Sequence, residues 1–138
     1  MEIMGIESLL QKYKGKKVLV TGHTGFKGSW LSIWLHLLGA KVIGFSLDPK
    51  GSNDNFVLSG IGDKIKDIRG DIRDREKLFK VFEEEKPEII FHLAAQALVI
   101  DGYSNPVLTY ETNTMGTVNV LEAIRRSETV STCIFITT

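Results

Sequence analysis

The segment Thr21 to Gly28 could bind a pyrophosphate, because it carries three glycines at intervals of three residues. In a dinucleotide site the first glycine permits a tight turn and the second lets the backbone approach the phosphates. The third lets the following helix pack close to the preceding strand. The beginning of that helix would offer free N–H groups and the positive end of its dipole. We therefore predict phosphate binding by seven residues. They are Gly22, His23, Thr24, Gly25, Phe26, Lys27 and Gly28.

An acidic residue lies at the distance from these glycines that a dinucleotide site requires. Asp48 lies 20 residues after Gly28, at the end of an apolar segment predicted to be a strand. A carboxylate there can accept hydrogen bonds from a ribose 2′-hydroxyl and would repel a 2′-phosphate. We therefore predict NAD as the cofactor, in preference to NADP, although Lys50 would weaken this preference. The alternative is a structural turn followed by a loop aspartate.

Two side chains of the glycine segment have open roles. His23 either contacts ribose or phosphate or caps the turn, and Lys27 either adds positive charge near the pyrophosphate or is a solvated helix residue. The other two histidines are predicted to be a core or boundary residue (His36) and a hydrogen-bonded core residue (His92). Since the histidines lack metal-ligand spacing, we predict no metal site.

Strand and helix patterns alternate along the chain and would position these residues. Short apolar segments predict strands at 17–21, 41–47, 65–69, 88–93 and 132–138. Periodic apolar segments predict helices at 3–13, 25–38, 74–86 and 106–126. Residues 48–63 are predicted to be a loop with a short helix at 54–59, and residues 97–105 a second loop. Asn105 and Pro106 would cap and begin the last helix.

The helix predicted at 25–38 is apolar on nearly every side, so we expect neighbouring elements to cover it. Trp30 and Trp34 share one of its faces and are predicted to be core residues.

The alternation of strands and helices predicts an α/β fold, a Rossmann-type doubly wound parallel sheet of about five strands. The 138 residues suffice for one domain. We expect residues 1–138 to be an incomplete NAD-binding domain without a substrate domain, because the sequence ends inside the predicted fifth strand.

Composition argues against several classes of partner. Lys plus Arg and Asp plus Glu number 17 each, so no basic excess indicates nucleic acid. The single cysteine cannot form an internal disulfide. No apolar segment is long enough to span a membrane, and the first residues lack the pattern of a signal peptide. We therefore predict a cytoplasmic protein.

The spacing Gly-x-x-Gly-x-x-Gly resembles the extended short-chain dehydrogenase/reductase family. The segments Gly70–Asp74 (GDIRD), Phe91–Gln96 (FHLAAQ) and Thr112–Thr117 (TNTMGT) agree with this resemblance. It implies contacts to adenine after the third strand and to the nicotinamide ribose and phosphates after the fourth. The implied residues are Asp71, Ile72, Leu93, Ala94, Ala95 and Gln96. Asn113 is added because asparagine is poorly suited to the middle of a helix, so we expect its amide near the active site.

Longer segments, among them TGHTGFKGSWLSIWL and FHLAAQALV, are similar to the CDP-glucose 4,6-dehydratase branch of this family. The resemblance implies a lyase of nucleotide-sugar metabolism that acts on CDP-glucose. In the family reaction NAD⁺ takes a hydride from sugar C4, water is eliminated across C5 and C6, and the hydride returns to C6. The product, CDP-4-keto-6-deoxyglucose, leads to deoxysugars of bacterial surface polysaccharide.

Most of the catalytic residues that the resemblance implies lie outside this sequence. The family's Tyr-x-x-x-Lys motif follows the fifth strand, whereas the match Tyr13 to Lys17 precedes the first strand. Thr138 matches the hydroxyl that would hydrogen-bond the sugar's 4-hydroxyl, and it is the one catalytic residue predicted here. We therefore expect the 138 residues alone to be inactive.

The resemblance also implies a homodimer, since the family's long helix, here 106–126, pairs across a two-fold axis. Two alternatives remain open. The chain could be a non-catalytic NAD-binding module, or the cofactor half of another nucleotide-sugar epimerase or reductase of the extended family.

Overall fold

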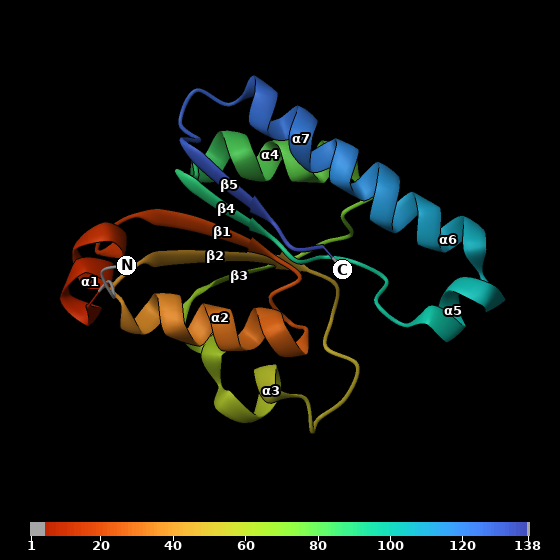
Figure 1. The fold of residues 1–138 in the computed structure, drawn as a ribbon, viewed down its shortest axis with the longest axis horizontal. Coiled ribbons are helices and arrows are strands. Elements are labelled where there is room, and N and C mark those ends of the chain that lie inside the picture. Colours follow the sequence, from red (N-terminus) through yellow and green to blue (C-terminus); the bar gives the residue numbers. More distant parts are fainter. Residues whose placement is uncertain (1–4, 138) are drawn as a thin grey trace.

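The computed structural model describes residues 5–137, in which five parallel strands form one sheet in the order β3-β2-β1-β4-β5 (Figure 1). The strands are β1 Lys17–Thr21, β2 Lys41–Ser46, β3 Lys66–Arg69, β4 Ile89–His92 and β5 Thr132–Phe135. The α-helices are α1 Ile6–Tyr13, α2 Phe26–Leu37, α3 Asn55–Ser59, α4 Arg75–Glu85, α5 Val99–Ser104, α6 Pro106–Tyr110 and α7 Gly116–Arg126. A 3₁₀-helix, η1, spans Ile61–Lys64, and a π-helix, η2, spans Glu111–Met115.

The strand order reverses at β1, which pairs with β2 on one side and with β4 on the other. Thr21, at the end of β1, is level with Phe45 of β2 and His92 of β4. The carboxyl ends of these strands therefore meet at one edge, where doubly wound sheets bind their ligands. The predicted Rossmann-type fold is confirmed.

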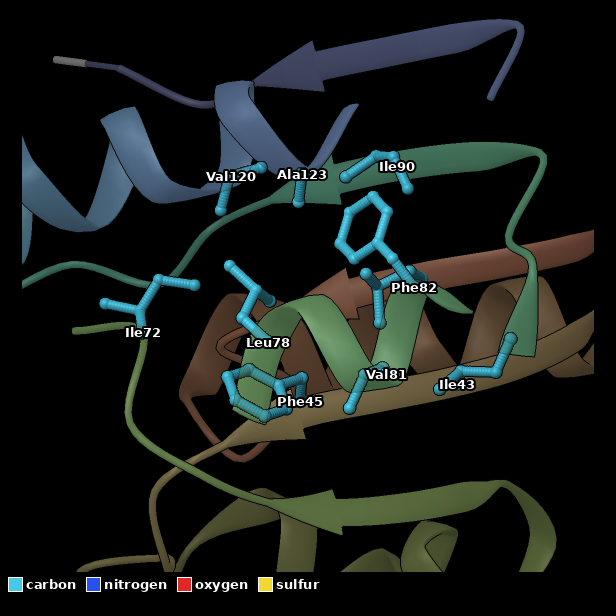
Figure 2. Close-up of a cluster of buried hydrophobic side chains, with 10 residues drawn as sticks. Ile43, Phe45, Ile72, Leu78, Val81, Phe82, Ile90, Val120 and Ala123 are labelled. Carbon is cyan, nitrogen blue, oxygen red and sulfur yellow. The ribbon is translucent and has the colours of Figure 1, made fainter. Parts of the chain in front are cut away.

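Helices cover both faces of the sheet, with α2 and α3 on one side and α4 and α7 on the other (Figure 1). Central strands are buried on both faces, which explains their continuous apolar sequence. Val18 and Val20 pack in the cluster that includes Leu35 of α2. Leu19 points to the opposite face and joins the larger cluster. That cluster contains Leu19, Ile43, Phe45, Ile72, Leu78, Val81, Phe82, Ile90, Val120 and Ala123 (Figure 2).

The helix predicted at 106–126 is confirmed as one continuous run of α6, η2 and α7. The Asn105 side chain accepts a hydrogen bond from the backbone N–H of Leu108 at 3.2 Å, and Pro106 occupies the first turn. Both features fulfil the expected N-terminal cap. Within residues 5–137, no helix combines the length and apolar character needed to cross a membrane.

The loop predicted at 97–105 is wrong in part, because Val99–Ser104 forms α5. This six-residue helix buries none of its side chains, so its sequence lacks the apolar periodicity that predicts helices.

The prediction that Trp30 and Trp34 are core residues is also wrong. Trp30 is 49% exposed and Trp34 is 67% exposed. The face of α2 that packs on the sheet consists of small residues with one leucine. They are Gly28, Ser29, Ser32 and Leu35. Because small residues let α2 lie close to the sheet, its bulky aromatic residues are left on the other face.

Leu78→Ala tests the larger cluster. Leu78 is fully buried there, so we expect a loss of roughly 2–5 kcal/mol in the free energy of unfolding. Urea titration followed by circular dichroism would measure this loss. Lys80→Ala is the control on the same helix, since the Lys80 side chain is 72% exposed and its ion pair with Glu84 lies at the surface. A loss no larger than that of the control would contradict the packing described here.

Candidate cofactor-binding site

The turn between β1 and α2 is built on close contacts of its glycines. Gly22 has a φ of 77°, and a Cβ there would lie 2.8 Å from the backbone nitrogen of Ala94. A Cβ on Gly28 would collide with the carbonyl oxygen of Gly22. The Gly25 N–H donates to that same carbonyl at 3.0 Å. The turn therefore requires glycine for its backbone conformation at Gly22 and for close approach at Gly28.

The beginning of α2 is free to bind an anion. Its N-cap is Gly25, and no side chain among the described residues caps the first turn. Unpaired N–H groups at a helix start, together with the helix dipole, form an anion site. Phe26 is 75% exposed beside this site and Lys27 is also exposed. Both interpretations of Lys27 stay open.

The His23 side chain does not face the anion site. It is fully buried, and its Nε2 lies 2.7 Å from Oδ1 of Asp67. A carboxylate only accepts, so Nε2 carries the proton, and Nδ1 has no hydrogen-bond partner within residues 5–137. Burial lowers the pKa of His23, which keeps the ring neutral. Of the two interpretations, the structure supports a role in the turn and leaves only the backbone of His23 to a cofactor.

Thr24 ties the turn to the end of β2. Its hydroxyl donates to the carbonyl of Leu47 at 3.0 Å and lies 2.9 Å from the Ser46 hydroxyl. Thr24 is 7% exposed, so this side chain too supports the turn from inside.

Asp48 follows β2 directly, and its side chain is 87% exposed. Its Oδ1 lies 3.8 Å from Nε of Arg69, at the end of β3. An exposed carboxylate beside the glycine turn is the arrangement that binds a ribose diol. Arg69 was not predicted as a site residue, because nothing in the local sequence of β3 indicates a partner for Asp48.

The two residues expected near adenine differ in exposure. The Asp71 carboxylate pairs with the Arg73 guanidinium at 2.6 Å, and this hydrogen-bonded pair lowers the pKa of Asp71. The Ile72 side chain is only 5% exposed and belongs to the core. Its carbonyl accepts a hydrogen bond from Asn119 at 3.1 Å. Asp71 therefore supplies the polar side chain at this position, while the buried side chain of Ile72 fixes the segment to the core.

Asn113 holds the segment that follows β4. Its Oδ1 accepts from the Gln96 N–H at 2.7 Å and its Nδ2 donates to the Gln96 carbonyl at 3.0 Å. Asn113 lies in the π-helix η2, a distortion often found at functional sites. Its amide thus makes two specific backbone hydrogen bonds, and its predicted contact with the cofactor stays a prediction. It fixes the backbone of Gln96, at the end of the segment that begins with Leu93.

A second set of hydrogen bonds holds this segment from below. The Thr21 hydroxyl accepts from the N–H groups of Leu93 and Ala94, both at 3.2 Å, so its own proton goes to Nδ1 of His92 at 2.6 Å. Nε2 of His92 then donates to Thr117 at 3.0 Å, whose hydroxyl donates to the Asn113 carbonyl at 2.8 Å. His92 is therefore the hydrogen-bonded core histidine that the sequence predicts, in one tautomer.

These groups gather at the carboxyl ends of β1, β2, β3 and β4, as the doubly wound fold requires. The predicted catalytic residue, Thr138, lies outside the described residues. In the part of the chain that the structure describes, no three His, Cys, Asp or Glu residues gather as metal ligands. The open helix start, the glycine turn and the exposed carboxylate fit the phosphates and a ribose of a dinucleotide.

Comparison with known proteins agrees with this geometry. The family model described as GDP-mannose 4,6 dehydratase matches residues 19–138. The chain belongs to this family. Its membership confirms the predicted resemblance to the extended short-chain dehydrogenases/reductases and, among them, to the nucleotide-sugar dehydratases.

Three relatives show how far the similarity to this family extends. CDP-glucose 4,6-dehydratase of Salmonella typhimurium is 48% identical over 91% of this chain and 35% of its own length. An epimerase structure from Methanothermobacter thermautotrophicus has a TM-score of 0.81 at 33% identity, over 94% of this chain and 37% of that one. The Thermus thermophilus UDP-glucose 4-epimerase complex with NAD has a TM-score of 0.73 at 33% identity, over 84% and 36%. The chain thus spans little more than a third of these proteins.

Gly28→Ala tests the close approach at the turn. The added methyl group would displace the Gly22 carbonyl, so we expect about 1–3 kcal/mol lower free energy of unfolding. Chemical denaturation would measure it. Gly51→Ala is the control, because a Cβ at Gly51 meets nothing within 4 Å. Equal stability of the two variants would show that the turn has room for a side chain.

His92 makes stability depend on pH. Burial lowers its pKa from 6.5 to about 4, so the unfolded chain takes up a proton at a higher pH than the native protein does. The stability from the neutral ring is present above pH 6.5 and is lost as the pH falls toward 4, by about 2 kcal/mol between pH 7 and pH 5.

Urea titrations at pH 7 and pH 5 would measure this loss, and His92→Gln should reduce it. The lowered pKa of His23 acts in the same direction and would leave a residual pH dependence in the variant. An unchanged pH dependence in His92→Gln would contradict the assignment.

Proposed function

We propose that this chain is the NAD-binding part of a CDP-glucose 4,6-dehydratase. The observation that carries the proposal is the uncapped start of α2 behind a glycine turn, beside the exposed Asp48 carboxylate. Identity of 48% to the Salmonella dehydratase supports CDP-glucose as the substrate of the whole protein. The NAD named with the similar Thermus epimerase supports the cofactor.

Each part of the site has a distinct task in this proposal. The N–H groups at the start of α2 bind the pyrophosphate, and Asp48 accepts hydrogen bonds from the adenosine ribose. Asn113 and Thr21 hold the backbone of Leu93 to Gln96, which borders the nicotinamide side. NAD held by these residues would supply the acceptor for a hydride from the sugar. The rigid hydrogen bonds around His92 fix the position of this segment without placing a charge beneath it.

The remaining parts of the proposal concern the whole protein. Residues 1–138 form an incomplete cofactor domain, and Thr138 bonds the sugar's 4-hydroxyl. Tyr13 and Lys17 take no part, because Lys17 begins β1 at the end of the strand remote from the turn. These 138 residues alone would not convert CDP-glucose, and formation of a keto sugar in a stoichiometric assay would contradict this. We also propose that the protein acts in the cytoplasm.

An epimerase is the second candidate function. The Methanothermobacter epimerase superposes on 94% of this chain with a TM-score of 0.81. Because the cofactor half has the same fold in both kinds of enzyme, residues outside this half decide the reaction. The identity of 48% to the dehydratase favours dehydration.

The long helix supports the proposed homodimer. Apolar side chains at intervals of three to five residues are exposed along one run of α6, η2 and α7. They are Val107, Tyr110, Met115, Val118 and Leu121. Such a stripe buries apolar area when it pairs with its own copy, and sedimentation velocity showing only monomer would count against pairing.

Calorimetric titration with NAD⁺ and with NADP⁺ tests the proposed cofactor site. We expect saturable binding with a preference for NAD⁺. Asp48→Asn should weaken NAD⁺ binding by about tenfold or more, because a charged acceptor for the ribose is lost.

Asp63→Asn, which changes an exposed carboxylate in η1, is the control and should bind as the unmodified chain does. Absence of binding to either dinucleotide would contradict the proposed function of this chain. If Asp48→Asn binds NAD⁺ as the unmodified chain does, the proposed role of the glycine turn would stand and the proposed role of Asp48 would be wrong.

A further inference from the structure

Arg69 lies between two carboxylates at the carboxyl end of β3. Its Nη2 donates to Oδ2 of Asp67 at 2.8 Å, and its Nε lies 3.8 Å from Oδ1 of Asp48. Its Nη1 donates to the carbonyl of Leu47 at 3.3 Å. Each of the three guanidinium nitrogens thus faces an oxygen of the protein.

Asp67 is itself fixed from the interior. Its Oδ1 accepts from Nε2 of the buried His23, so its other oxygen is directed at Arg69. The ring of Phe56 lies 4.9 Å below the guanidinium and meets the His23 ring edge to face at 5.3 Å. A fixed carboxylate and an aromatic ring together leave Arg69 little freedom to reorient.

The position of Arg69 matters because an arginine beside the ribose carboxylate is the usual means of accepting a 2′-phosphate. A guanidinium binds phosphate through two parallel hydrogen bonds. Free to turn outward next to Asp48, Arg69 would supply those bonds and make NADP an acceptable cofactor. In the structure, however, Nη2 of Arg69 donates to Asp67 and Nη1 donates to the carbonyl of Leu47, so both groups are directed toward the protein.

We propose that Asp67 determines cofactor specificity by holding Arg69 away from a 2′-phosphate and beside Asp48. This inference rests on the proposed NAD site and would account for a preference for NAD over NADP at a site with an arginine at its rim. The two carboxylates and one guanidinium, with a neutral His23, also leave a net negative charge at the carboxyl ends of β2 and β3. Asp67 does not touch the cofactor, so it is a positioning residue that acts through Arg69.

Asp67→Asn tests the proposal with little change in shape. Asparagine can still accept the hydrogen bond from His23, but it presents an amide in place of the oxygen that holds Arg69. We expect NADP⁺ to bind about fivefold or more tightly relative to NAD⁺ than in the unmodified chain, measured by calorimetric titration with each dinucleotide. Thermal unfolding of each variant would confirm that it is folded.

Two further variants separate release of Arg69 from a general change in charge. Asp63→Asn removes the same charge from an exposed position in η1 and should leave the preference unchanged. In the double variant Asp67→Asn/Arg69→Met the gain in NADP⁺ binding should disappear, because the released guanidinium is absent. Lys50 is present in all variants, so its charge cannot account for a difference between them.

The results distinguish this inference from the proposal on which it rests. An unmodified chain that binds neither dinucleotide would overturn both. An unmodified chain that binds NAD⁺, with an unchanged preference in Asp67→Asn, would overturn the role of Asp67 alone. A gain in NADP⁺ binding that persists in the double variant, or that Asp63→Asn reproduces, would show that charge and not Arg69 sets the preference.

Discussion

The close approach of α2 to the turn after β1 is the constraint on which the candidate site depends. Gly28 lies against the Gly22 carbonyl, and Gly22 lies against the backbone of Ala94 after β4. Because no side chain fits at either glycine, the helix start, the turn and the loop after β4 are brought together as backbone alone. The N–H groups of the helix can then face a ligand at short range, which a side chain would prevent.

The polar groups beneath this backbone form a chain of hydrogen bonds in which every partner is neutral. The path from Leu93 through Thr21, His92 and Thr117 to Asn113 joins three parts of the fold. Every buried atom along it has one possible role as donor or acceptor, which favours a single arrangement. By contrast, the polar groups at the end of β3 are charged. Asp67, Arg69 and Asp48 lie closer to solvent, where the desolvation cost of an ion pair is smaller.

Local sequence predicted most of the fold because its strands are short apolar runs and its helices have clear ends. Asn105 with Pro106 marked one helix start, and the glycine spacing marked the phosphate turn. Apolar character did not show which face of α2 is buried, since Gly28, Ser29 and Ser32 allow close packing that Trp30 and Trp34 do not. The bond between His23 and Asp67 joins residues 44 positions apart, and such pairing leaves no local signal.

Both tryptophans of the chain lie on α2, the helix whose first turn forms the anion site. Trp30 is one helical turn beyond Phe26 and half exposed. Trp34 is a turn further away and more exposed. The intrinsic tryptophan fluorescence of this protein therefore comes entirely from exposed indoles on the one helix that begins at the candidate site.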